Sequence, residues 1–119
     1  MAEHSDLGFW GELVAIDYLK SKGYFVSHHG WRLGHKDLDI VAIDNSTKEI
    51  VFVEVKTRRD NLFSEPEDSI DADKIKNLKS AAAAYLRYYK ITRDARFDII
   101  SIIGTTDEDH TLRHLINAF

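Results

Sequence analysis

Four charged residues, Asp37, Asp39, Glu54 and Lys56, interrupt two apolar, β-branched runs of the chain. The polar segment 45–48 separates these runs, a pattern that is typical of a β-hairpin. If the turn closes symmetrically, paired positions sum to 93, which sets Asp39 opposite Glu54 and Asp37 opposite Lys56. Facing residues of antiparallel strands share one side of the sheet, with Cβ atoms about 4.5–5.5 Å apart. We therefore predict that these acids and the lysine converge on one patch.

Such a patch has a definite electrostatic requirement. The second run carries apolar residues on both of its faces, which indicates a central strand covered on both sides. Burial of an unpaired carboxylate there would cost several kcal/mol or force its protonation, and Asp39 and Glu54 would also repel each other. A divalent cation, Lys56 or both would offset this repulsion.

The remaining pattern predicts the elements that position the patch. The first is a helix over 5–22 that ends at Gly23. Glu12 lies on a stripe of small and apolar residues of this helix, so it is either half-exposed or held near a cation; a solvated helix glutamate is the alternative. The further elements expected are a strand over 24–33, a polar loop over 58–68, a helix from 69 or 71 to 89 or 90, and strands over 96–103 and 111–119.

Histidines and basic residues flank the hairpin. His28 and His29 are adjacent in a strand, so their side chains should point to opposite faces and cannot chelate one metal together. Arg32 and Lys36 precede Asp37. Two interpretations of these basic residues stay open: a phosphate contact and a plain solvated surface. Lys74 lies at the edge of the apolar face of the second helix, where lysines usually extend to solvent.

The order of elements, α-β-β-β-α-β-β, predicts one α/β domain over residues 1–119. Its expected architecture is a three-layer sandwich in which helices flank a mixed five-stranded sheet. The 119-residue chain has no cysteine, which fits a reducing cytoplasm, and we expect neither a signal peptide nor membrane association. A net charge of −4 argues mildly against non-specific nucleic-acid binding.

Several motifs spread over nearly the whole chain resemble one known family. Asp39, 14 intervening residues and Glu54-Val55-Lys56 resemble the PD-(D/E)XK nuclease signature. The accompanying motifs are Gly8-x-x-Gly11-Glu12-x-x-Ala15-x-x-Tyr18-Leu19, Gly23-Tyr24, Asp37-Leu38-Asp39-Ile40-Val41-Ala42, Phe52-Val53-Glu54-Val55-Lys56-Thr57-Arg58, Lys74, Arg96-Phe97-Asp98 and Asn117-Ala118-Phe119. Together they are similar to the YraN-like family of predicted endonucleases, which is in turn similar to archaeal Holliday-junction resolvases.

The resemblance implies a restriction-endonuclease-like fold and assigns roles to matching positions. Asp39 and Glu54 match the metal-binding acids, Lys56 the catalytic lysine and Glu12 the helical acid. The carboxylate oxygens of Asp39, Glu54 and Glu12, together with the main-chain carbonyl of Val55, suit Mg²⁺ or Mn²⁺. The chain departs from the family at Lys36, where many members have glycine, and it lacks the proline before Asp39 that gives the superfamily its name.

The expected function is metal-dependent hydrolysis of phosphodiester bonds in nucleic acid, with DNA, including branched or structured DNA, as the substrate class. A homodimer is expected because paired cuts on two strands need two sites. Two alternatives stay open: a non-catalytic nucleic-acid-binding or protein-interaction module that keeps the nuclease fold, and a purely structural ion-pair network. The residues expected to contact the nucleic-acid backbone are Arg32, Lys36, Arg58, Arg59 and Lys74.

Overall fold

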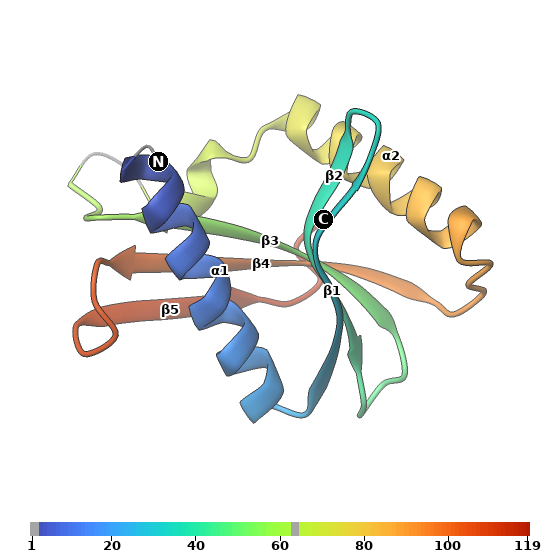
Figure 1. Ribbon diagram of the computed structural model, residues 1–119, viewed down its shortest axis with the longest axis horizontal. Helices are drawn as coiled ribbons and strands as arrows, with labels where there is room; N and C mark the ends of the chain where they lie inside the picture. The colour runs from blue at the N-terminus through green and yellow to red at the C-terminus, as the bar shows by residue number, and fades with distance from the viewer. Residues whose placement is uncertain (1–2, 63–64) are drawn as a thin grey trace.

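A mixed five-stranded sheet forms the centre of the structure, a computed structural model that describes residues 3–62 and 65–119 (Figure 1). The strands follow one another across the sheet in the order of the chain. They are β1 (Tyr24–Leu33), β2 (Lys36–Asp44), β3 (Ile50–Arg58), β4 (Ala95–Gly104) and β5 (His110–Leu115). Only the β3–β4 pair is parallel, because the connection between these two strands contains a helix.

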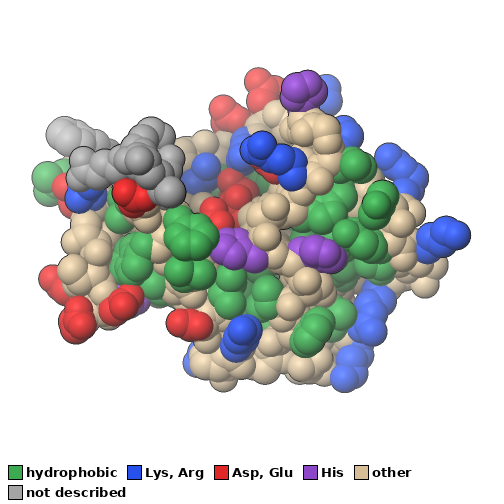
Figure 2. Space-filling view, in the orientation of Figure 1, with side chains coloured by type: hydrophobic (Ala, Val, Ile, Leu, Met, Phe, Trp, Pro, Cys, Tyr) green, Lys and Arg blue, Asp and Glu red, His purple; other side chains and the backbone are tan. Residues whose placement is uncertain are grey.

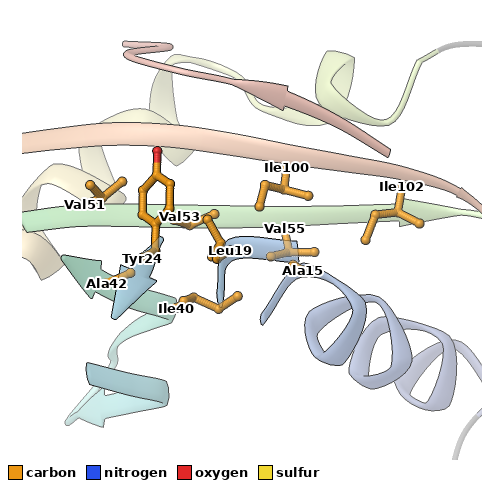
Figure 3. Packing of buried hydrophobic residues seen from close by; sticks show 10 residues of the cluster. All are labelled: Ala15, Leu19, Tyr24, Ile40, Ala42, Val51, Val53, Val55, Ile100 and Ile102. Atoms are coloured by element: carbon orange, nitrogen blue, oxygen red, sulfur yellow. The ribbon is translucent and has the colours of Figure 1, made fainter. Parts of the chain in front are cut away.

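The two long helices, α1 (Glu3–Ser21) and α2 (Ala72–Tyr88), cover opposite faces of this sheet. The alternation along β3 explains the arrangement, since Val51, Val53 and Val55 pack toward α1, as Figure 3 shows. Ile50 and Phe52 of the same strand pack toward α2. The predicted three-layer α/β sandwich with element order α-β-β-β-α-β-β is confirmed.

The predicted hairpin register is confirmed over four pairs, from Ile43–Ile50 to Ile40–Val53. Beyond Ile40 the two strands stop pairing, so the predicted ladder pairs Asp39–Glu54 and Asp37–Lys56 are wrong. The start of β2 keeps its pairing with the end of β1 on its other edge, and β3 continues alongside β4 as far as Arg58. The strands therefore diverge just where the acidic residues begin.

Other differences from the prediction lie at element ends. The connection predicted as a plain loop over 58–68 contains a short 3-10 helix, η1 (Pro66–Ser69). The last strand ends at Leu115, not at residue 119, because Asn117 has a φ of 55° and its N–H donates to Oδ1 of Asp98. No helix among the described residues is long and apolar enough to cross a membrane.

A buried polar cluster joins the sheet to the β2–β3 turn. The Arg96 guanidinium donates to both carboxylate oxygens of Asp98 at 2.9 Å and to Asp44 at 2.9 Å. It also donates to the Tyr24 hydroxyl at 2.7 Å, while His114 lies 2.7 Å from Asp98. Because Asp98 is fully buried, these partners satisfy a charge that would otherwise destabilise the fold.

Candidate functional site

Asp39 is held at the point where β2 and β3 separate. Its Oδ2 accepts a hydrogen bond of 2.9 Å from the main-chain N–H of Val55. Since the N–H and C=O of one strand residue point to the same side of the strand, the carbonyl of Val55 also faces the β2 side. The carboxyl group of Asp39 and this carbonyl are therefore neighbours at the open end of the hairpin.

The environment of Asp39 disfavours its charged form. Burial, followed by repulsion from the Glu54 carboxylate, raises the pKa of Asp39 to about 8, although the Val55 N–H acts in the opposite direction. Glu12 adds a smaller Coulombic contribution that also raises this pKa. The hairpin pattern predicts this repulsion, and the structure brings Asp39 and Glu54 together although they lie beyond the last ladder pair.

Glu54 is only 4% exposed and has two lysines as partners. The Nζ atoms of Lys56 and Lys74 lie 3.4 and 3.3 Å from its Oε2. Lys56 follows Glu54 by two residues on the same face of β3. Lys74 comes from the first turn of α2, which the Asp71 side chain caps by accepting the Lys74 main-chain N–H at 2.9 Å.

The contact between Lys74 and Glu54 differs from the sequence-based expectation. The edge position predicted that Lys74 extends to solvent, but this side chain turns inward to the buried carboxylate. Burial alone would lower the pKa of Lys74, and the Glu54 carboxylate, followed by Asp39 and Asp37, outweighs burial so that the pKa is raised. Lys74 therefore stays charged beside the acid pair.

Glu12 lies on the α1 side of the sheet, and within the described parts of the chain it forms no hydrogen bond or ion pair with Asp39 or Glu54. Its Oε1 is 2.7 Å from Nε2 of His29, and the His29 ring stacks on Phe9 with centroids 5.8 Å apart. The adjacent His28 bonds the Tyr85 hydroxyl on the α2 side at 2.6 Å, so the prediction that the two histidines point to opposite faces is confirmed.

Gly11 determines how closely α1 approaches this end of β3. A Cβ atom at Gly11 would collide with the side chain of Thr57. The absence of a side chain at position 11 therefore lets α1 pack against the strand that carries Glu54 and Lys56, and it brings Glu12 alongside. This is a physical reason for a glycine directly before that acid.

Two open grooves flank the acid pair. The first, between α1 and the end of β3, has a volume of about 500 Å³ and is lined by residues that include Glu12, Val55 and Lys56. Arg58 and Arg59 line the same groove. The second, between the β1–β2 turn and α2, has a volume of about 350 Å³. Its lining includes His35, Lys36, Asp37, Lys74, Asn77 and Ser80.

The basic residues expected to contact a nucleic-acid backbone are spread around these grooves. Lys36 donates to the Ser80 hydroxyl at 2.7 Å, which joins the β1–β2 turn to α2. Arg32 lies 3.7 Å from Asp37, and both side chains are exposed. Arg58 is exposed and donates to the carbonyl of Thr57 at 3.4 Å.

The donor atoms at the open end of the hairpin are hard oxygens from Asp39, Glu54 and the Val55 carbonyl. Among residues 3–62 and 65–119, no three His, Asp or Glu side chains converge as a complete ligand set. Two carboxylates and a carbonyl, supplemented by water, nevertheless fit Mg²⁺ or Mn²⁺, which commonly keep several water ligands. The repulsion between the two carboxylates further favours a bound cation.

Two contacts of the site were missed by sequence reasoning. The pairing of Glu12 with His29 depends on how α1 crosses β1, and no local pattern reports that crossing. The inward orientation of Lys74 had a weak signal, since it precedes Leu78 by four residues and both therefore lie on the sheet side of α2.

Comparison with known proteins identifies relatives along the full chain. The profile of "Uncharacterised protein family UPF0102" matches residues 11–102. A UPF0102 protein of Bacteroides thetaiotaomicron is 45% identical over 119 residues, which cover 100% of this chain and 96% of that protein. A UPF0102 protein of Syntrophomonas wolfei is 40% identical over 115 residues, which cover 96% of this chain and 97% of that protein. The chain therefore belongs to the uncharacterised family UPF0102, the YraN-like family that its motifs indicate.

Proposed function

We propose that this protein is a Mg²⁺- or Mn²⁺-dependent nuclease that hydrolyses phosphodiester bonds of nucleic acid, with DNA as the substrate. The observation that carries the proposal is the grouping of Asp39, Glu54 and Val55 oxygens beside Lys56 at the open end of a hairpin. A phosphodiester is negatively charged and resists attack, so its hydrolysis needs cationic groups and an activated water.

Asp39, Glu54 and the Val55 carbonyl would hold the divalent ion. When bound, the ion would polarise the phosphate and lower the pKa of a water molecule. The fixed hydrogen bond from Val55 to Asp39 orients this carboxyl group before any ion arrives. Pre-organisation of this kind reduces the cost of assembling a catalytic site.

Lys56 is the residue best placed to act on the reacting phosphate. Its side chain is 24% exposed and its ammonium group lies 3.4 Å from the buried Glu54, while the residue also lines the groove beside α1. From there its ammonium group would orient the attacking water or stabilise negative charge that develops on the phosphate. Glu12, fixed by His29, would act from the opposite wall of the groove through a water molecule.

The substrate would lie across the two grooves that flank the acid pair. Lys36 and Lys74 line one groove, and Arg58 and Arg59 line the other, so both would contact phosphates. Arg32 would extend this surface along β1. A cytoplasmic location and a homodimer that cuts both strands are part of the proposal, and sedimentation of the purified protein tests the dimer.

A cleavage assay tests the activity directly. Single-stranded, duplex and branched DNA and RNA are incubated with the protein in Mg²⁺, Mn²⁺ or EDTA. We expect metal-dependent cleavage that falls at least about 100-fold in Glu54→Gln and Lys56→Met. Glu108→Gln and Lys20→Gln replace exposed residues on other elements and serve as controls that keep the wild-type rate.

Two results would decide against the proposal. Equal cleavage by the wild type, Glu54→Gln and Lys56→Met would assign the activity to a contaminant. Tight nucleic-acid binding without cleavage of any of these substrates would favour the alternative of a non-catalytic binding module. Thermal unfolding of each variant shows whether a lost activity reflects a lost fold.

A further inference from the structure

The positive charge of the chain is concentrated in one segment. Residues 74–93 contain six of the 16 lysines and arginines and none of the 20 acidic residues, although the whole chain has a net charge of −4. These six are Lys74, Lys76, Lys79, Arg87, Lys90 and Arg93. The segment comprises most of α2 and the turn that follows it. The remainder of the chain is correspondingly acidic.

Most of these charges lie on one side of α2. Leu78 and Tyr85 are buried against the sheet, whereas Lys76, Lys79 and Arg87 are exposed. At 100° per residue, these three project within about 80° of one another, away from the buried face. Lys90 continues the row just after the helix ends. We call Lys76, Lys79, Arg87 and Lys90 the outer face of α2.

No carboxylate neutralises the outer face. Within the described parts of the chain, none of its four cations forms an ion pair, and Lys79 lies over the Phe97 ring at 5.9 Å. In the space-filling view, blue side chains gather toward the α2 end of the molecule, whereas red side chains are numerous at the opposite end (Figure 2). Among residues 3–62 and 65–119, this row of like charges has no carboxylate partner, and Lys79 has an aromatic one.

We propose that the outer face of α2 binds the sugar–phosphate backbone of a nucleic acid without regard to sequence. The inference deepens the proposed function and rests on it for the claim that this is the nucleic acid that the acid pair cleaves. The two sites are connected, because Lys74 in the first turn of α2 contacts Glu54 and the helix then runs away from the acid pair.

The dimensions of the helix suit a phosphate backbone. Arg87 follows Lys76 by eleven positions, which corresponds to about 16 Å at 1.5 Å per residue. This length matches about five nucleotides at a rise of 3.4 Å per nucleotide. A strand that leaves the acid pair along α2 would therefore meet a lysine or arginine at intervals over about half a helical turn.

The composition of α2 argues against a membrane surface or another protein as the partner of the outer face. A helix that binds a membrane surface inserts an apolar face, but Leu78, Ala82 and Tyr85 of α2 are already buried in the core. Protein interfaces usually have an apolar centre, whereas the exposed apolar residue that lies among the cations of the outer face is the small Ala83. Phosphate recognition needs no apolar centre.

The test measures binding without metal, so it does not depend on cleavage. A fluorescent 20-base-pair duplex is titrated in EDTA at several salt concentrations with the wild type and Lys76→Gln/Arg87→Gln. We expect the double variant to bind on the order of tenfold more weakly at low salt. The plot of log K against log salt should become less steep: the magnitude of its negative slope should decrease by about 1.8, which is about 0.9 for each lost phosphate contact.

The matched control is Lys20→Gln/Lys22→Gln, which removes the same charge from the end of α1. Unchanged affinity and slope in Lys76→Gln/Arg87→Gln would overturn the proposal, as would an equal loss in the control. A loss confined to binding of anionic phospholipid vesicles would overturn it in favour of a membrane surface. If the α2 variant loses binding but Glu54→Gln retains all nuclease activity, phosphate binding by the outer face is supported and the proposed catalytic site is wrong.

Discussion

The main-chain N–H of Val55 donates a 2.9 Å hydrogen bond to Oδ2 of Asp39, directly beyond the last paired residues of β2 and β3. A side chain thus joins the two strands where their main chains separate. Asp39, which is partly buried, is consequently fixed in place by the protein alone, next to the buried carboxylate of Glu54. The geometry stores an electrostatic penalty that a bound cation would relieve.

The first prediction concerns Asp39 and pH. Its pKa in the folded protein, about 8, lies above the ordinary value of 3.8, so the folded state retains a proton that the unfolded chain has lost. Stability should therefore decrease as pH rises from about 4 to 8. In EDTA at pH 8.5, Asp39→Asn should raise the free energy of unfolding by at least about 1 kcal/mol, with no gain at pH 4.

Urea unfolding at the two pH values measures this effect. Asp17→Asn, an exposed acid on α1, provides the control and should show no such pH dependence. If Asp39→Asn destabilised the protein equally at pH 4 and 8.5, the idea of a strained carboxyl pair would be wrong.

The second prediction concerns the lysine from α2. Because Lys74 lies 3.3 Å from Glu54, its positive charge competes with a divalent ion for the same carboxylate. Lys74→Met should therefore bind Mn²⁺ more tightly than the wild type, on the order of threefold to tenfold, by calorimetry without substrate. Nucleic-acid cleavage should nevertheless fall, because a phosphate contact is lost.

Lys76→Met on the same helix is the control, since it faces away from the sheet and should leave the Mn²⁺ affinity unchanged. Identical Mn²⁺ affinities of Lys74→Met and the wild type would show that Lys74 does not compete for the site. A lower melting temperature with unchanged affinity would assign Lys74 a structural role only.

The third prediction concerns the buried cluster around Arg96. Arg96→Met would leave Asp98 and Asp44 without their principal cation. We expect the free energy of unfolding to fall by about 3–5 kcal/mol, the range for breaking a buried ion pair from one side. Arg87→Met, at an exposed position of α2, should change it by less than about 0.5 kcal/mol. Equal effects would contradict the assigned importance of the cluster.

The same cluster predicts sensitivity to acid. Burial would raise the pKa of Asp98, but hydrogen bonds from His114, Arg96 and Asn117 outweigh it and lower the pKa. The pKa of Asp44 is likewise well below its usual range, because bonds from Ser46 and Arg96 outweigh its burial. These depressed values contribute stability at neutral pH that is lost as pH falls below about 4. Urea midpoints between pH 2.5 and 7 measure the loss.

The fourth prediction concerns the approach of α1 to β3. Gly11→Ala should destabilise the protein by about 1–3 kcal/mol, because the new methyl group meets the Thr57 side chain. The additional change Thr57→Ala should recover part of that loss, as measured by urea unfolding. Gly8→Ala is the matched control, since a Cβ atom there meets no neighbouring atom within 4 Å. Equal costs at positions 8 and 11 would refute the packing argument.

Much of the hairpin and of the acidic site that it carries can be predicted from the local sequence. The short turn after Asp44 predicts the register of the hairpin, and the alternation along β3 assigns its residues to two faces. The divergence of β2 and β3 beyond Ile40 could not be predicted in this way, because β2 stays paired with β1 and β3 with β4, and no local pattern marks where the β2–β3 ladder ends.

Contacts between elements that are distant in the sequence could not be predicted from local patterns either. Lys74 reaches Glu54 only because α2 begins beside the end of β3, and Glu12 meets His29 only because α1 crosses β1. Patterns of polarity place each side chain on a face of its own element, but they do not say which element covers that face. The family motifs include Lys74 and Glu12, but they do not indicate which side chains these two residues contact.

The central claim is that Asp39, Glu54 and the Val55 carbonyl bind a divalent cation. Crystals soaked in Mn²⁺ at pH 8.5, where the Asp39 carboxyl group is largely ionised, would test it by anomalous diffraction. We predict an anomalous peak bonded to Asp39 and Glu54 in the wild type and none at that position in Glu54→Gln. Absence of the peak from well-diffracting wild-type crystals, or a peak that persists in the variant, would contradict the claim.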